Sequence, residues 1–156
     1  MGTETLPHIP PYGSLDLTFK VKMVSREDIE SFLDRLAHEG ATHEEVQPGL
    51  WRVQPGGMLD ADVIVHYNPP VVVLRLKVMN VPKDGAATDK LNRRLLELNA
   101  SDLVHGSYGI SDGVIVLTEA LELSHLDYEE FQASYESMTL ALATHMRELA
   151  SFREET

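Results

Sequence analysis

Two short stretches of the sequence begin like catalytic motifs but lack a residue that the chemistry needs. His43-Glu44 starts the zinc-protease pattern H-E-x-x-H, in which two histidines one helical turn apart hold the metal, but Gln47 replaces the second histidine. His105 replaces the first glycine of the G-x-S-x-G turn that would expose Ser107 as a nucleophile. We therefore predict no catalytic residue in either stretch.

The patterns for metal and phosphate binding are also incomplete. Asp60 and Asp62 resemble the start of a calcium loop, but Ile64 occupies a position that needs an oxygen ligand. No glycine-rich loop is followed by Lys-Ser or Lys-Thr, so we expect no phosphate-binding loop. We predict no metal and no cofactor. The alternative function, a small-molecule or metal-binding enzyme domain, would have to use the run from His43 to Glu45.

Composition and charge narrow the class of function. The chain has 156 residues, 43% of them apolar, which suffices for one domain with a single core. It has no cysteine, so disulfides and thiolate metal sites are excluded. The net charge is -12, and between Leu95 and Met146 there are nine acidic residues and no Lys or Arg. Such a surface repels phosphate backbones, so we expect no direct nucleic-acid binding and a protein partner of basic character. The alternative is that the acidic surface only keeps the protein soluble.

The N-terminal residues indicate neither a leader nor an anchor. The first fourteen residues contain three prolines and no Lys or Arg, so they lack the basic start of a secretory signal peptide. No apolar run approaches the ~18 residues of a membrane span. We therefore expect a cytoplasmic protein with no membrane contact, in which residues 1–14 are a flexible arm and residues 15–156 form a single domain.

The first half of the chain predicts a strand, a helix and three further strands. Apolar and polar residues alternate from Leu15 to Met23, which is typical of a half-buried strand. A helix follows with Ser25 and Asp28 as its capping pair and Gly40 at its end. Turn residues then separate three expected strands, which are Glu45 to Val53, Ala61 to Tyr67 and Val71 to Val81.

A long amphipathic helix from Asp127 to Phe152 is the most distinct element. Asp127 and Glu130 stand at its N-cap and third positions, where carboxylates accept the free amide hydrogens of the first turn. Apolar residues then recur at spacings of four and three, and only His145 interrupts the resulting seam of Phe131, Tyr135, Met138, Leu142, His145, Leu149 and Phe152. A seam about 40 Å long must lie across a sheet or contact another chain.

The order of the elements predicts an α+β fold. A helix from Thr88 to Asn99 and two strands, Ser107 to Ile110 and Val114 to Leu123, complete the order β-α-β-β-β-α-β-β-α. We expect an antiparallel sheet with flanking helices and connections too short for parallel crossovers. Both faces of the strand from Val71 carry apolar residues, so something should cover the second face. The candidate partner-binding residues are Val71, Val73, Met79 and Phe32.

Part of the second half resembles a known family. The residues that carry the resemblance are LLELN at Leu95 to Asn99, GSYGI at Gly106 to Ile110, the Asp112-Gly113 turn, VIVL at Val114 to Leu117, and the capped long helix. Together they are similar to the C-terminal half of a type III secretion chaperone and to the YbjN-like proteins, which share that fold. The resemblance covers about Leu91 to Leu149.

The resemblance implies a small, acidic, homodimeric, chaperone-like protein that binds another polypeptide without catalysis. Dimers of this family commonly use the second helix or the sheet beside it, which corresponds here to Leu91, Leu95 and Leu98. The chain departs from the secretion chaperones by its arm and its strand from Leu15 to Met23, which favours the YbjN-like proteins. The arm could exchange between protomers or cover the sheet.

Overall fold

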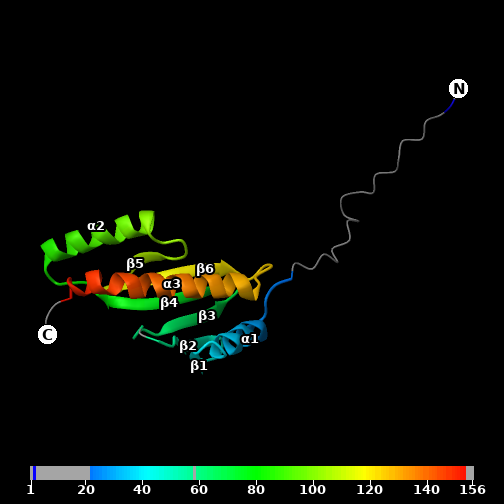
Figure 1. Ribbon diagram of the computed structural model, residues 1–156. Coiled ribbons are helices and arrows are strands. Elements are labelled where there is room, and N and C mark those ends of the chain that lie inside the picture. The colour runs from blue at the N-terminus through cyan, green and yellow to red at the C-terminus, as the bar shows by residue number, and fades with distance from the viewer. Residues whose placement is uncertain (1, 3–21, 58, 154–156) are drawn as a thin grey trace.

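The structure is a computed structural model that describes residue 2, residues 22–57 and residues 59–153. The elements within these residues are α1 (Arg26–Ala37), β1 (Thr42–Gln47), β2 (Leu50–Gln54), β3 (Val63–Asn68), β4 (Val71–Asn80), α2 (Gly85–Ser101), β5 (Ser107–Ser111), β6 (Val114–Glu122) and α3 (Tyr128–Ala150) (Figure 1). The expected arm and most of the strand from Leu15 to Met23 lie outside the described residues. Met23 itself forms an isolated antiparallel bridge with Ser124.

The strands form one sheet in the order β1-β2-β3-β4-β6-β5, and all of its ladders are antiparallel, as the sequence predicts. The prediction that no crossover occurs is wrong at one place. β4 and β5 both pair antiparallel with β6, so they run in the same direction on its two sides. The 17 residues of α2 are long enough to carry the chain from one to the other.

Carboxylates and a serine set the starts of the helices. The amide of Asp28 donates to Ser25 Oγ at 3.1 Å and the amide of Ser25 donates to Asp28 Oδ2 at 2.8 Å, which is the predicted capping box of α1. In α3 the amide of Glu130 donates to Asp127 Oδ1 at 2.8 Å. The second helix starts before Thr88, because Asp84 caps it instead.

Two expected strands differ in detail from the structure. The strand predicted from Glu45 to Val53 is two strands, β1 and β2, because Gly49 takes a φ of 75° and reverses the chain after Gln47. In β4 the pairing shifts between Lys77 and Met79. This bulge moves Met79 from the second face to the covered face, where it lies opposite Ile115 and is buried.

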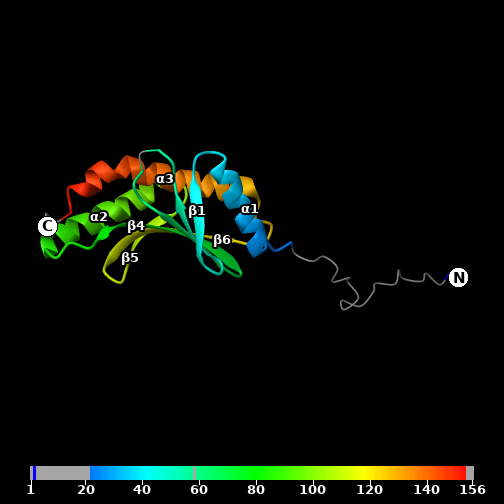
Figure 2. The same cartoon turned by 90° about the horizontal axis from the view of Figure 1, so that it is seen from below.

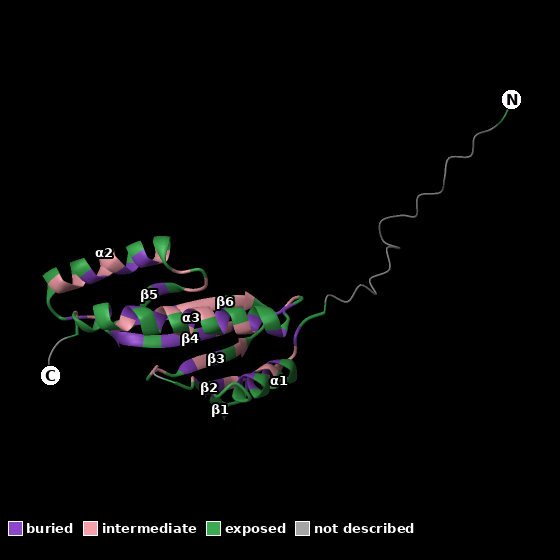
Figure 3. Cartoon of the chain, viewed as in Figure 1, coloured by how far each residue is buried: buried purple, intermediate pink, exposed green. Residues whose placement is uncertain are grey.

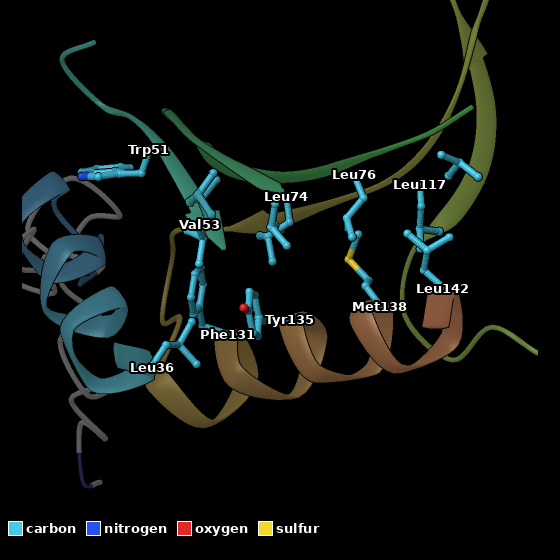
Figure 4. Close-up of a cluster of buried hydrophobic side chains, with 14 of the residues drawn as sticks. Leu36, Trp51, Val53, Leu74, Leu76, Leu117, Phe131, Tyr135, Met138 and Leu142 are labelled. Atoms are coloured by element: carbon cyan, nitrogen blue, oxygen red, sulfur yellow. The ribbon is translucent and has the colours of Figure 1, made fainter. Parts of the chain in front are cut away.

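All three helices lie on one face of the sheet (Figure 2). The seam of α3 rests on this face, where Phe131 points toward Val53 of β2, Met138 toward Leu76 of β4 and Leu142 toward Leu117 of β6 (Figure 4). All three seam residues are fully buried. Burying each such side chain contributes roughly 1.5–3 kcal/mol relative to leaving it exposed. The seam therefore packs along its length against the sheet of its own chain.

The opposite face of the sheet carries no helix of the described chain. Val71 and Val73 are half-buried there, and Arg75 and Lys77 are exposed. Exposed residues also follow the outer sides of the helices (Figure 3). Of the helices that the structure describes, none combines the length and the hydropathy that a bilayer crossing needs.

Candidate binding surfaces

Exposed apolar side chains gather where α2 passes beside the edge strand β5. Leu96 is 68% exposed and Ile110 is 54% exposed, although both are large and apolar. They border a shallow groove of about 320 Å³, whose lining residues we call the α2–β5 surface: Asn92, Leu95, Leu96, Tyr108, Gly109 and Ile110. β5 ends the sheet, so its outer backbone edge lies next to this groove.

The predicted dimer residues lie beneath this surface. Leu91, Leu95 and Leu98 follow helical spacing on the inner side of α2 and are 0%, 4% and 0% exposed. Of the three, Leu95 borders the groove. A contact through α2 in this conformation would therefore begin with Leu96, and the assignment of the interface to the three buried leucines stays a prediction.

Asn99 fixes the end of α2 to β5. Its Oδ1 accepts from the amide of Tyr108 at 2.7 Å, and its Nδ2 donates to the carbonyl of Tyr108 at 3.1 Å. One side chain thus satisfies both backbone groups of a strand residue, in the way a neighbouring strand would. The groove between Leu96 and Ile110 is consequently bounded by two elements that are held together.

A chain of polar contacts lies behind the groove and joins β5, α3 and the C-cap of α2, with Tyr108 and His145 buried and Asp102 at its exposed end. The hydroxyl of Tyr108 lies 2.7 Å from His145 Nδ1, and His145 Nε2 lies 3.3 Å from Asp102 Oδ2. Burial raises the pKa of Tyr108, and the negative charges of Asp102 and Glu148 raise it further. Hydrogen bonds from Ser101 and His145 lower the pKa of Asp102. Both ring nitrogens of His145 have partners, so the histidine that interrupts the seam is a satisfied structural residue.

The run from His43 to Glu45 does not converge on a common point. His43 Nε2 lies 3.0 Å from Asp34 Oδ1, whereas Glu44 faces Arg52 at 3.6 Å. The guanidinium of Arg26 bonds the Glu45 carboxylate and lowers its pKa. Within residues 22–57 and 59–153, no three His, Asp or Glu side chains are grouped closely enough to hold a metal ion.

The four candidate partner-binding residues lie in different surroundings. Val71 and Val73 are on the helix-free face, Met79 is buried on the other, and Phe32 is half-buried between α1 and α3. The Phe32 ring centroid lies 5.8 Å from that of Tyr128 and 5.6 Å from that of Phe131. The structure therefore brings only Val71 and Val73 together.

Sequence reasoning missed Leu96 and Ile110, the two exposed apolar residues that border the groove. Leu96 follows Leu95 directly and therefore lies off the apolar stripe of its helix, which was a readable signal. The sequence signal for the exposure of Ile110 was weaker, because an apolar residue in a strand is usually assigned to the core.

Comparison with known proteins identifies the fold. The CesT_Tir_1 family model matches residues 23–155. No curated protein sequence matches the chain significantly. A chain of the heterodimeric ExoU–SpcU complex from the type III secretion system of Pseudomonas aeruginosa superposes with a TM-score of 0.59 at 16% identity, covering 76% of this chain and 95% of that one. YbjN, a putative transcription regulator from E. coli, superposes with a TM-score of 0.57 at 16% identity, covering 80% and 93%.

A third similar structure is the ExsC–ExsE complex, one chain of which superposes with a TM-score of 0.50 at 12% identity, covering 80% of this chain and 96% of that one. These likenesses confirm the predicted α+β fold and the predicted resemblance to YbjN and the type III secretion chaperones.

Proposed function

The chain belongs to the CesT_Tir_1 family, and from this membership we propose that it is a non-catalytic, chaperone-like adaptor that binds a protein partner. Support comes from the similar structures, among them the ExoU–SpcU complex and the HopA1–SchA chaperone–effector complex, in which a chain of this fold is seen with a second protein. The observation that carries the proposal is the helix-free face of the sheet, where the apolar side chains of Val71 and Val73 are half-buried without a covering element of the described chain.

We assign the α2–β5 surface, where exposed Leu96 and Ile110 border an apolar groove, to a homodimer. A two-fold contact places the same patch of each protomer against the other, so Leu96 of one copy would meet the groove of its partner. Stable interfaces bury roughly 1,200–2,000 Å² in total, so the outer side of α2 must also take part. Leu91, Leu95 and Leu98 would support the contact from beneath by holding α2 on the sheet.

The protein partner is assigned to the helix-free face of the sheet around Val71 and Val73, where apolar side chains are half-buried without a covering element of the described chain. The net charge of -12 favours a partner of basic character, because opposite charges accelerate and orient the encounter. Such a partner could itself bind nucleic acid, which this acidic chain should not do directly. The lack of cysteine fits action in the reducing cytoplasm.

Affinity purification from the native organism, followed by identification and reconstitution of the copurifying protein, tests the partner. We expect a basic protein whose affinity falls as salt rises, because screening weakens the charge attraction. Val73→Lys should weaken this complex, whereas Val46→Lys on the exposed strand β1 is the matched control that should leave it intact. Failure to recover a salt-sensitive partner with the unmodified chain would contradict the proposal.

A further inference from the structure

β6 is longer than its neighbour β5 and extends beyond it. β6 has nine residues and β5 has five, and the last pair in their register joins Ser107 to Thr118. On this side, the residues from Glu119 to Glu122 therefore face no other strand of the described chain. The amide of Leu123 donates to Pro70 on the opposite, β4 side. Because successive strand residues direct their backbone groups to alternate sides, the amides of Ala120 and Glu122 point to the unpaired edge.

A groove of about 380 Å³ follows this unpaired edge between β6 and the first turns of α3. Acidic residues line it, namely Glu119, Glu122 and Glu130, together with His105 from the loop before β5, and no Lys or Arg is among its lining residues. The groove thus joins three features on one side of the molecule: unpaired backbone groups, apolar contact through Leu121 and Leu126, and negative charge.

One of the two carboxylate oxygens of Glu119 has no hydrogen-bond donor in this groove. Its side chain is 19% exposed, and Oε1 lies 3.4 Å from His105 Nδ1. Oε2 is buried and accepts no hydrogen bond. A buried carboxylate oxygen without a donor is costly, and a cationic group entering the groove would remove that cost.

A hydrolytic role for this cluster fails on geometry. Ser134 Oγ lies 3.3 Å from His105 Nδ1, the same ring nitrogen that Glu119 approaches. A nucleophile–histidine–carboxylate relay needs the two partners on different nitrogens, so that the proton can pass through the ring. The groove is therefore suited to binding.

We propose that the edge of β6 from Glu119 to Glu122 binds an extended segment of the protein partner as an additional strand, with a lysine or arginine of that segment reaching Glu119. Main-chain hydrogen bonds from Ala120 and Glu122 supply affinity, and the carboxylate supplies selectivity. The register places Ala120 beside Val73 and Glu122 beside Val71, so the added strand continues the face already assigned to the partner. This inference rests on the proposed function and names the partner's chemistry.

The charge of the groove selects a foreign basic segment as the occupant. A second copy of this acidic chain would bring further negative charge against Glu119, Glu122 and Glu130. The chain's own residues 15–21 contain Lys20 and alternate between apolar and polar, and Met23 pairs with Ser124 at the rim of the groove. That segment is the competing occupant, and the experiment below separates the two.

A matched pair of labelled peptides tests the proposal on the full chain. Both are eight residues of alternating valine and threonine, with one central threonine replaced either by arginine or by its neutral isostere citrulline. Fluorescence anisotropy should show that the arginine peptide binds at least tenfold more tightly, since a hydrogen bond to a charged group is worth roughly 1.5–3 kcal/mol. Glu119→Gln should abolish this preference, whereas Glu129→Gln, outside the groove, should leave it unchanged.

A second pair of variants tests the backbone edge. Ala120→Pro removes the outward amide hydrogen and should weaken both peptides at least tenfold, whereas Ala120→Thr keeps that hydrogen and should bind like the unmodified chain. Circular dichroism and thermal unfolding confirm that both variants are folded. Equal binding of the two peptides, or binding that is insensitive to Glu119→Gln and Ala120→Pro, would overturn the proposal.

Binding that appears only after Leu17→Asp and Phe19→Asp would also overturn it, by assigning the groove to the chain's own N-terminal segment. The proposed function and the added strand can be told apart with the copurified partner. If Ala120→Pro still captures the salt-sensitive partner as well as the unmodified chain does, the adaptor function stands and the added strand is wrong.

Discussion

At both edges of the sheet a helix packs a leucine-rich side onto the covered face, but the two outer strands differ in charge and in exposed apolar residues. At one edge α1 buries Ile29, Leu33 and Leu36, and at the other α2 buries Leu91, Leu95 and Leu98. The outer strand at the first edge is THEEVQ, in which two glutamates are exposed and Val46 is 38% exposed. At the second edge the outer strand is SYGIS, which has no charge and exposes Ile110 beside Leu96.

This difference supports the proposed assignment of the second edge to the contact with another protomer. Charged residues on an edge strand discourage pairing with other strands, and β1 has them. Polar contacts do not separate the two edges, because Arg26 pairs with Glu45 at the first and Arg94 pairs with Glu148 at the second. The α2–β5 edge has an uncharged strand and uncovered apolar side chains, so it is the edge that a second protomer can cover.

The largest expected effect is on the feature that the two edges share. Leu33→Ala and Leu98→Ala each remove a fully buried side chain from the contact of a helix with the sheet. We expect each to lower the free energy of unfolding by roughly 2–5 kcal/mol, measured by urea denaturation. A loss below about 1 kcal/mol at either position would show that the helix at that edge is not part of the common core.

The second prediction separates the edges by their buried polar contacts. Tyr108→Phe leaves His145 Nδ1 without its 2.7 Å partner in a buried site and should cost about 1–3 kcal/mol. Tyr128→Phe, near α1, removes only a 3.5 Å contact with Glu39 and should cost less. Equal costs in thermal or urea unfolding would contradict the role given to the Tyr108–His145 contact.

The third prediction concerns alkaline pH. Burial raises the pKa of Tyr108 above the ordinary value of about 10 and raises that of Tyr135 to about 12. A raised folded-state pKa means that the stability held by these neutral hydroxyls is complete below about pH 10 and is lost as pH rises through the folded value. Tyr108→Phe should therefore lose less stability than the unmodified chain between pH 10 and 12, measured by urea unfolding. An unchanged pH dependence would contradict this origin of the shift.

The smallest expected effect is at the start of α1. Hydrogen bonds from Ser25 lower the pKa of Asp28, so its contribution is present above the ordinary value of about 4 and is lost as pH falls through the lowered one. Asp28→Asn should cost about 0.5–1 kcal/mol at pH 7 and almost nothing at pH 2. A cost that is independent of pH would show that the charge of Asp28 plays no part.

The elements with local signals could be predicted from the sequence. The caps at Ser25 and Asp127 and the seam of α3 depend on residues close together in the chain, and the structure confirms them. The Gly49 reversal was missed although Pro48-Gly49 is a local turn signal. The bulge after Lys77 was missed because it depends on how β4 pairs with β6. The same limit applies to the surfaces. Glu119 and Ile110 gain their exposure and contacts from β5 ending short and from α2 passing beside it, which no local pattern records.

Sedimentation equilibrium at micromolar concentration tests most directly that the α2–β5 surface joins two protomers into the adaptor. The unmodified chain and Val46→Asp, at the charged edge, should be dimers. Leu96→Asp should be a folded monomer, because burying its carboxylate in the contact would cost several kcal/mol. A monomeric unmodified chain would contradict the homodimer, and a dimeric Leu96→Asp variant would contradict the assignment of the interface to α2.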